Sequence, residues 1–288
     1  MTAVAKTVIV GVGLIGASLA AAGRRSGVLG RVVGVGRSKA NLETALRAGF
    51  IDEASSDPAA AVRDAGLVVI AAPVDTSIEL LERVAPACPA SCVLTDVGSV
   101  KAPIVRAAER IGIAARFVGA HPMAGGTRTG AAAADEGLYR GRTVVITPTP
   151  NVAKDAHDLV SSMWRSVGAE IVELDPDLHD QAVAMSSHLP QMLATALAAL
   201  VAGDPLHDLV ARLTGAGFRD TTRIAMSDAD MWVAITEANR THLLAAIDLF
   251  TRLWARVRDA VADADEEALR SLMLEAGAFR RGLERGRS

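Results

Sequence analysis

A glycine-rich turn directly after a β-branched run is the feature that most constrains this sequence. Residues 6–17 read KTVIVGVGLIGA, which places Gly11, Gly13 and Gly16 in the pattern Gly-x-Gly-x-x-Gly. In a strand–turn–helix unit the first glycine permits the turn, the second lets a pyrophosphate approach the backbone, and the third lets the helix pack against the strand. The helix N-terminus then offers free N–H groups to the phosphates. The pattern predicts a dinucleotide-binding domain.

The first 175 residues alternate short apolar runs with helical stretches. The runs do not alternate with polar residues, which is typical of strands buried on both faces. Strands alternating with helices indicate an α/β fold with a Rossmann-type, doubly wound, mostly parallel sheet. Strands are predicted at 6–13, 31–37, 65–73, 91–99, 115–122 and 142–148, with an edge strand at 168–175. Helices are predicted at 14–27, 40–49, 76–86 and 102–112.

Beyond residue 175 the strand signals stop and three long helical patterns follow. They span 176–203, with Pro190 as a kink, then 228–265 and 266–285. A length of 288 residues fits two domains. We therefore expect a dinucleotide-binding Rossmann domain at 1–174 and an all-helical substrate-binding and dimerisation domain at 175–288. These helices are apolar on more than one face, so burial between two copies predicts a homodimer.

Composition excludes several kinds of partner. A net charge of −3 gives no electrostatic case for nucleic acid or an anionic membrane. No leader segment or apolar stretch of membrane-spanning length is recognised, so we expect a cytoplasmic protein without a membrane partner. Cys88 and Cys92 form a lone Cys-x3-Cys pair, which predicts two reduced thiols and no metal site.

The end of the second predicted strand bears on the choice between NAD and NADP. An acidic residue there would bind the ribose 2′-hydroxyl, but Gly36 occupies that place and Arg37 and Ser38 follow. A 2′-phosphate could lie against the guanidinium and the hydroxyl, so NADP is favoured over NAD. The alternative is that Arg37 is an exposed turn residue beside the adenine. The residues predicted to contact the cofactor are Gly11, Gly13, Leu14, Ile15, Gly16, Gly36, Arg37, Ser38, Ala72, Pro73, Asp96 and Ser99.

A histidine lies at the end of the strand predicted at 115–122. Ligands of an open α/β sheet lie beyond the carboxyl ends of its strands, where His121 joins Asp96, Ser99 and Lys101 of the preceding strand end. A dehydrogenase that oxidises an alcohol needs a base for the hydroxyl proton, and neutral histidine suits that role near neutral pH. We predict His121 and Ser99 as the catalytic pair, with Ser99 orienting the imidazole. The alternative is that His121 makes a structural hydrogen bond in the loop.

Six motifs in order carry a resemblance to a known family. They read VGVGLIGASLA, AAPVD, TDVGSVK, GAHPMAGG, SHLPQML and GFRDTTRIAMSDADMW. Together they resemble the prephenate/arogenate dehydrogenase family of tyrosine biosynthesis, over roughly residues 6–250. The resemblance implies NAD(P)-dependent oxidative decarboxylation of prephenate to 4-hydroxyphenylpyruvate, or of arogenate to tyrosine. It also implies that His121 is the base, that Ser99 assists it, that His188 lines the substrate site, and that Arg223 pairs with a substrate carboxylate.

The sequence adds reasons for the last two roles and leaves alternatives. Pro190 could kink the helix and expose His188, and a dianionic substrate needs a fixed cation, for which Arg219 competes with Arg223. Gln191 and Gly126-Thr127 depart from the pattern of many prephenate-using members, so prephenate, arogenate and an amino-substituted analogue all stay open. The residues predicted to bind substrate are His188, Arg223, Gln191, Gly126, Thr127 and Arg219.

Other functions compete with this one. A β-hydroxyacid dehydrogenase would need a lysine in the helical half, but Lys6, Lys39, Lys101 and Lys154 all precede it. A pyrroline reductase would not need His121. A 4-amino-4-deoxyprephenate dehydrogenase of secondary metabolism would keep the site, and a non-catalytic NADP-binding redox sensor would not need the His121–Ser99 pair. We expect no regulatory or chorismate mutase domain after the helices.

Overall fold

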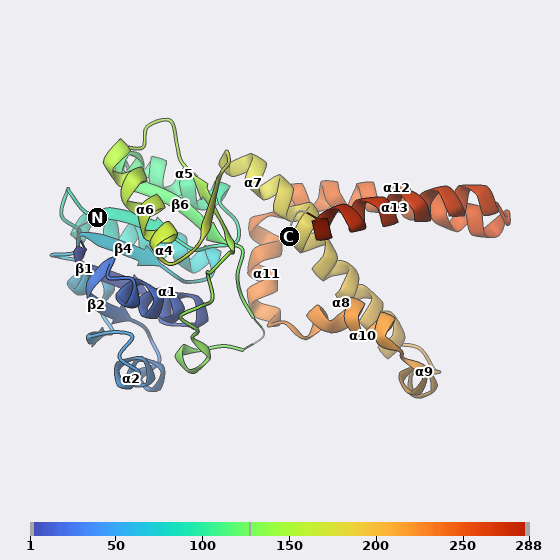
Figure 1. The fold of residues 1–288 in the computed structure, drawn as a ribbon, viewed down its shortest axis with the longest axis horizontal. Coiled ribbons are helices and arrows are strands. Elements are labelled where there is room, and N and C mark those ends of the chain that lie inside the picture. The colour runs from blue at the N-terminus through green and yellow to red at the C-terminus, as the bar shows by residue number, and fades with distance from the viewer. Residues whose placement is uncertain (1–2, 127, 286–288) are drawn as a thin grey trace. The chain divides into compact units, whose positions relative to one another are not determined.

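The computed structural model describes residues 3–126 and 128–285, and within them the strands form one eight-stranded sheet. The strand order is β3-β2-β1-β4-β5-β6-β7-β8 (Figure 1). Neighbouring strands are parallel except β6 and β7, which pair antiparallel. The predicted mostly parallel, doubly wound sheet is therefore confirmed. The strands are β1 (Val4–Val10), β2 (Leu29–Val35), β3 (Glu53–Ser55), β4 (Leu67–Ile70), β5 (Val93–Asp96), β6 (Phe117–Pro122), β7 (Thr143–Thr147) and β8 (Glu170–Glu173).

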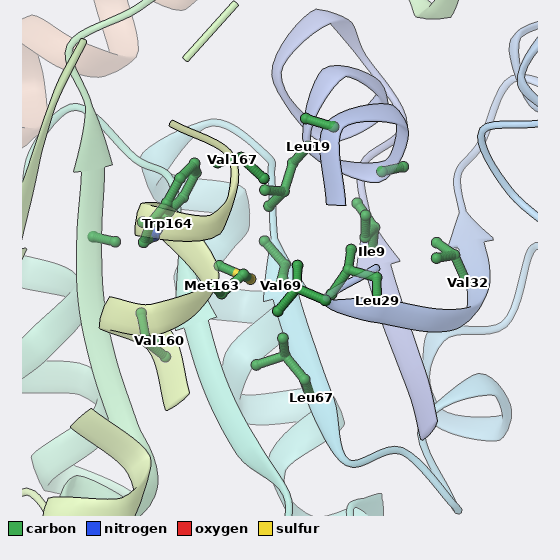
Figure 2. Packing of buried hydrophobic residues seen from close by; sticks show 14 of the residues in the cluster. Ile9, Leu19, Leu29, Val32, Leu67, Val69, Val160, Met163, Trp164 and Val167 are labelled. Atoms are coloured by element: carbon green, nitrogen blue, oxygen red, sulfur yellow. The ribbon is translucent and has the colours of Figure 1, made fainter. Parts of the chain in front are cut away.

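Helices cover both faces of the sheet, which explains why its strands are apolar throughout. Ile9 of β1 packs in one cluster with α1 (Leu14–Arg25) and α6 (Lys154–Ser166). Val8 of the same strand packs in a second cluster with helices of the opposite face. Figure 2 shows the first cluster, in which Leu19 and Trp164 come from the two helices. The helices of the opposite face are α3 (Pro58–Ala61), α4 (Val74–Val84) and α5 (Ala102–Arg110), while α2 (Lys39–Arg47) follows β2.

The predicted helix at 176–203 is interrupted before its proline. It consists of α7 (Pro176–Val183), one π-helical turn (Ala184–His188) and α8 (Leu189–Ala202). Pro190 lies in the first turn of α8, directly after the π turn. Wider turns of this kind recur at functional sites. His188 is the last residue of the π turn.

The prediction of a single helix over 228–265 is wrong, because the helix is broken at Asn239. The chain forms α11 (Ala229–Ala238) and α12 (Arg240–Ala262) instead. The Asn239 side chain donates hydrogen bonds away from the helix, and such competition with the helical ladder favours a helix end at asparagine. Before these helices come α9 (His207–Leu213), α10 (Ala216–Thr222) and a 3₁₀ turn (Arg223–Met226), and after them α13 (Glu266–Arg285).

Contacts divide the molecule into two compact units. The first is Met1–Arg240, which contains the sheet and the helices through α11, and the second is Thr241–Ser288. The second unit carries exposed apolar side chains at Trp254, Met273 and Phe279. This division groups the helices through α11 with the sheet. The domain boundary predicted at residue 174 stays a prediction.

One helical run meets the length and composition of a membrane-crossing segment. It is Pro176–Ala202, with a mean hydropathy of 1.2 in its most apolar window. Core helices meet the same criteria, and this run carries buried polar side chains at His179, Asp180 and His188. These polar groups are central to the site described next.

Candidate active site

The glycine turn between β1 and α1 has the shape that a dinucleotide requires. Gly11 has φ +105°, and a Cβ there would lie 2.0 Å from the carbonyl oxygen of Ala71. A Cβ on Gly16 would lie 2.1 Å from the Gly11 carbonyl oxygen. A Cβ on Gly13 would have no described atom within 4 Å, so this face of the turn is open. The turn therefore fits a pyrophosphate, with the uncapped N–H groups of α1 facing it.

The other predicted cofactor residues lie at the same edge of the sheet. Leu14 and Ile15 begin α1, and Ala72 and Pro73 follow β4 immediately before α4. Gly36 and Arg37 follow β2, and the Ser38 hydroxyl caps α2 by accepting the Asn41 N–H at 3.3 Å. Arg37 is exposed and has no ion-pair or hydrogen-bond partner among the described residues.

Sequence reasoning missed a residue that supports this turn from outside. The Asn41 amide donates to the carbonyl oxygen of Val12 inside the glycine turn, and its Oδ1 accepts from the Ala131 N–H at 2.6 Å. The Tyr139 hydroxyl donates to the Ile15 carbonyl at 2.6 Å. The segment between β6 and β7 is thus fastened to the cofactor turn.

His121 belongs to a buried series of hydrogen bonds. Its Nδ1 lies 2.8 Å from Nε2 of His179, and Nδ1 of His179 lies 2.7 Å from Oδ1 of Asp180. The two rings meet edge to face at 5.1 Å. We call this arrangement the His–His–Asp series. The Asp180 carboxylate also accepts the backbone N–H groups of Lys101 at 2.7 Å and Ala102 at 2.8 Å, so it caps α5 from α7.

When both imidazoles are neutral, the series fixes where the protons lie. A carboxylate only accepts, so His179 donates to Asp180 through Nδ1–H, and a neutral His179 accepts at Nε2. His121 must then carry its hydrogen on Nδ1, which leaves a lone pair on Nε2. This Nε2 has no protein partner among the described residues. Burial, with His179, Lys101 and His188 nearby, holds the pKa of His121 well below its ordinary value of 6.5, so the ring is a neutral acceptor at neutral pH.

The Asp96 side chain lies beneath the site. Its carboxylate is fully buried and accepts from Lys101 Nζ and from the Gly98 N–H at 2.8 Å, while Oδ1 lies 3.3 Å from the Ala120 N–H. The Lys101 ammonium also donates to the Ala120 carbonyl at 2.9 Å. Asp96 therefore lies beneath the site and supports the strand that carries His121. Its predicted contact with the cofactor stays a prediction.

Ser99 is half-buried in the loop after β5, and within the described residues it has no hydrogen-bond partner. The nitrogen that orients His121 faces His179 instead. The assisting role of Ser99 thus stays a prediction, confined to the Nε2 side of the imidazole or to the substrate.

His188 is almost fully buried, and its expected place in the substrate cleft stays a prediction. Its Nδ1 lies 3.1 Å from Nδ2 of Asn239, and its ring meets the edge of Trp232 at 5.8 Å. Burial lowers its pKa to about 4. Asn239 Nδ2 also donates to the Asp180 carbonyl oxygen at 2.8 Å, which links His188 to the His–His–Asp series.

The remaining predicted substrate residues differ in their surroundings. Gln191 is buried and donates from Nε2 to the Ile224 carbonyl at 3.0 Å, which holds the turn that carries Arg223 against α8. Arg223 and Arg219 are both exposed and have no partner within the described ranges. Gly126 lies near the cofactor turn, since a Cβ on it would lie 3.7 Å from the Leu14 side chain. Thr127 lies outside the described residues. All these binding roles stay predictions.

The sequence carried weak signals for the residues it did not reveal. His179 and Asp180 form a polar pair inside an apolar helical pattern, shortly before the SHLP motif. Asn239 is a polar residue in the middle of a predicted long helix. Among the described residues no group of three or more His, Cys, Asp or Glu side chains could hold a metal, and Cys88 and Cys92 are free.

A dinucleotide cradle and a neutral imidazole whose Nε2 has no partner among the described residues lie at one sheet edge and define an oxidoreductase of the nucleotide-dependent dehydrogenase class. Residues 19–173 match the family model "Prephenate dehydrogenase, nucleotide-binding domain", and residues 175–275 match "Prephenate dehydrogenase, dimerization domain". The chain belongs to the prephenate dehydrogenase family.

Individual relatives agree with this assignment. The chain is 33% identical to prephenate dehydrogenase of Bacillus subtilis, over 96% of this chain and 75% of the relative. It is also similar to the crystal structure of A. aeolicus prephenate dehydrogenase with hydroxyphenyl propionate and NAD+, at 33% identity, TM-score 0.89, and 96% and 98% coverage. Synechocystis arogenate dehydrogenase follows at 30% identity, TM-score 0.83, and 96% and 99% coverage. The predicted family and the class of NAD(P)-dependent dehydrogenase are confirmed.

Proposed function

We propose that this chain catalyses the NAD(P)-dependent oxidative decarboxylation of prephenate to 4-hydroxyphenylpyruvate, or of arogenate to tyrosine. The observation that carries the proposal is the His–His–Asp series, which leaves Nε2 of His121 as a neutral acceptor at the carboxyl end of β6. The dinucleotide cradle lies at the carboxyl ends of β1 and β4 in the same sheet. A base and a hydride acceptor at one sheet edge suit the oxidation of a ring alcohol.

The chemistry divides between the cofactor and the side chains. When bound, the nicotinamide supplies a hydride acceptor. Nε2 of His121 takes the proton of the ring hydroxyl as the carbon–oxygen double bond forms. His179 and Asp180 stabilise the resulting positive charge through the hydrogen bond at Nδ1. Loss of the ring carboxylate as carbon dioxide makes the ring aromatic, and the proton on His121 returns to the phenolic oxygen, so the proton count balances.

A dianionic substrate also needs a cation. Arg223 is our candidate, because the Gln191–Ile224 hydrogen bond fixes the turn that presents it, and the guanidinium has no described protein partner. Arg219, three residues inside α10 from its N-terminal end, is the competing candidate. Gln191 and Gly126, together with Thr127, are candidates for recognising the pyruvyl or alanyl side chain.

NADP is the cofactor that the β2 end favours. No carboxylate follows β2, the Arg37 guanidinium is exposed, and the N-terminus of α2 begins two residues later. The guanidinium and the helix N-terminus attract a 2′-phosphate, and no carboxylate is present there to repel it. Replacement of Arg37 by glutamate should raise the KM for NADP by about tenfold or more and leave the KM for NAD little changed. An equal change for both cofactors would assign Arg37 to the adenine instead.

We also propose a homodimer in the cytoplasm. The dimerization-domain match and the exposed apolar residues Trp254, Met273 and Phe279 support association of two copies. Light scattering of the purified protein at several concentrations measures the mass directly, and a monomer at all of them would contradict the dimer.

The test of the activity is a grid of four assays that follow the absorbance of reduced nicotinamide. Prephenate and arogenate are each combined with NAD and with NADP. Turnover in any of the four supports the reaction and identifies substrate and cofactor together. If all four fail while the protein binds cofactor, the tyrosine-pathway assignment is wrong. An amino-substituted analogue such as 4-amino-4-deoxyprephenate, or a sensing role, is tested next.

A further inference from the structure

Two of the three buried histidines of the site, His121 and His188, are held in opposite hydrogen-bonding states. His121 faces the acceptor Nε2 of His179, whereas Nδ1 of His188 faces the donor Nδ2 of Asn239. We propose that Asn239 is a positioning residue that fixes His188 as a neutral imidazole with its hydrogen on Nε2, so that His188 donates a hydrogen bond to an oxygen of the substrate. This proposal rests on the proposed function for the identity of that substrate.

The orientation of the Asn239 amide follows from its other partner. Nδ2 lies 2.8 Å from the backbone carbonyl oxygen of Asp180, which can only accept. A flipped amide would set Oδ1 against that carbonyl, oxygen against oxygen, so the NH₂ group must face it. The second hydrogen of the same NH₂ is then available to His188 Nδ1 at 3.1 Å. Nδ1 of His188 is therefore an acceptor.

A neutral imidazole that accepts at Nδ1 must carry its hydrogen at Nε2. The surroundings keep His188 neutral: the side chain is almost fully buried, and Trp232 packs edge-on against it. The charged and titratable groups that act on it are Asp180, which favours the charged form, and His179, which opposes it. Burial outweighs both and lowers the pKa of His188 to about 4.

The surroundings of Asn239 indicate a role beyond ending a helix. Asn239 ends α11 and interrupts what would otherwise be one helix through α12. The residue is almost fully buried, and its Oδ1 is a buried oxygen with no partner among the described residues. A residue that only ended a helix would not need a buried amide aimed at two acceptors on α7 and the π turn.

Asp180 connects the two states. Its side chain accepts from His179 and so makes Nε2 of His121 an acceptor, while its backbone carbonyl orients Asn239 and so makes Nε2 of His188 a donor. Neither Nε2 atom has a protein partner in the described part of the chain. His121 can thus accept a proton at Nε2, whereas His188 can donate a hydrogen bond from Nε2 to an oxygen.

The first measurement needs no substrate. Long-range ¹H–¹⁵N spectra of histidine-labelled wild-type protein at neutral pH distinguish protonated from unprotonated ring nitrogens, and the His188 signals are those absent from the spectrum of His188→Gln. We expect a protonated Nε2 and an unprotonated Nδ1. A ring protonated on Nδ1, or on both nitrogens, would overturn the proposal. This readout stands even if no substrate of the grid turns over, so its failure is separate from failure of the proposed function.

The second measurement uses Asn239→Asp, which keeps the shape, removes the donor and also sets an oxygen against the Asp180 carbonyl, a cost that is shared by the His188→Gln background used as the control below. The carboxylate would place the hydrogen of His188 on Nδ1 and make Nε2 an acceptor facing the substrate oxygen. We expect the substrate KM to rise about 10- to 100-fold at mildly alkaline pH with kcat changed much less. On acidification the same carboxylate favours the imidazolium, which restores Nε2–H, so KM should fall back toward the wild-type value.

The matched control is the same substitution in a His188→Gln background. If Asn239 acts through His188, Asn239→Asp should add little to the KM of His188→Gln. An equal rise in KM in both backgrounds, or a loss of kcat without the recovery of KM at acidic pH, would assign Asn239 a purely structural role and contradict the proposal. Circular dichroism of each variant checks that it is folded.

Discussion

The cofactor turn and the histidine site are assembled in opposite ways. The turn comes from neighbouring residues, since Gly11, Gly13 and Gly16 lie within six positions of one another. The histidine site gathers His121 from β6, His179 and Asp180 from α7, His188 from the π turn and Asn239 from the end of α11. A local backbone requirement leaves a contiguous pattern in the sequence, whereas a hydrogen-bonded series does not. The comparison predicts that substitutions in the glycine turn and in the histidine site have different effects on stability, cofactor binding and turnover.

The largest expected effect is on the histidine site. His121→Asn removes the acceptor at Nε2, so kcat should fall by roughly 10³- to 10⁴-fold, within the range for general-base catalysis. Cofactor affinity, measured by fluorescence titration of the reduced dinucleotide, should stay unchanged because the turn is separate. Substantial residual turnover would show that another group takes the proton.

The next largest effect is expected in the glycine turn, where Gly11 and Gly13 distinguish a loss of stability from a loss of cofactor binding. Gly11→Ala should lower the free energy of unfolding by about 3 kcal/mol, because its Cβ would lie 2.0 Å from a carbonyl oxygen at a φ of +105°. Gly13→Ala has open space around its Cβ, so it should leave the cofactor-free protein about as stable and weaken cofactor binding about tenfold or more. Urea unfolding and cofactor titration measure the two. Equal destabilisation by both would contradict the distinction.

The pH dependence of stability probes the burial of the histidine site. An unfolded histidine binds its proton below about pH 6.5, whereas folded His188 binds one only near pH 4. Between these values the unfolded state holds more protons, so the free energy of unfolding should decrease as pH falls, by up to about 3 kcal/mol from His188 alone. Urea titrations of His188→Gln should show a flatter decrease over this window. An unchanged slope would mean that His188 is not buried as described.

A smaller effect is expected at Asp180, whose carboxylate both caps α5 and accepts a hydrogen bond from His179. Asp180→Asn would set an NH₂ group against a backbone N–H or the His179 donor, because both carboxylate oxygens accept. We expect a loss of about 1–2 kcal/mol in unfolding free energy, as for a removed helix cap, and a fall in kcat of about 10- to 100-fold. Thermal melts and steady-state kinetics report the two. A change in one without the other would separate the cap from the base.

The sheet was largely predictable because its strands are long enough and apolar enough to stand out. Seven of its strands were expected near their observed positions, including the edge strand β8 (Glu170–Glu173). β3 (Glu53–Ser55) escaped notice because three residues with a polar start show no pattern. The antiparallel direction of β7 was also hidden, because pattern shows that a strand exists but not which way it runs beside its neighbour.

The histidine site was only half predictable. His121 stood out because a loop proline and glycines follow it, and His188 stood out through its motif. His179 and Asp180 did not, since a buried polar pair in a helix is visible only when its partners across the fold are known. Asn239 was absorbed into one predicted helix, because helical periodicity takes no account of a side chain that bonds elsewhere.

The Asp180 carboxylate joins α7 to the start of α5, beside the Arg106–Asp177 ion pair between the same two helices. One side chain of α7 holds the first N–H groups of α5 and the second imidazole of the site at once. Movement of α7 away from α5 would break the Asp180 hydrogen bonds to Lys101 and Ala102, and it would carry His179 away from His121. Because we propose His121 as the base, we expect turnover to require that α7 and α5 stay in contact, whereas the glycine turn between β1 and α1 contains no residue of either helix.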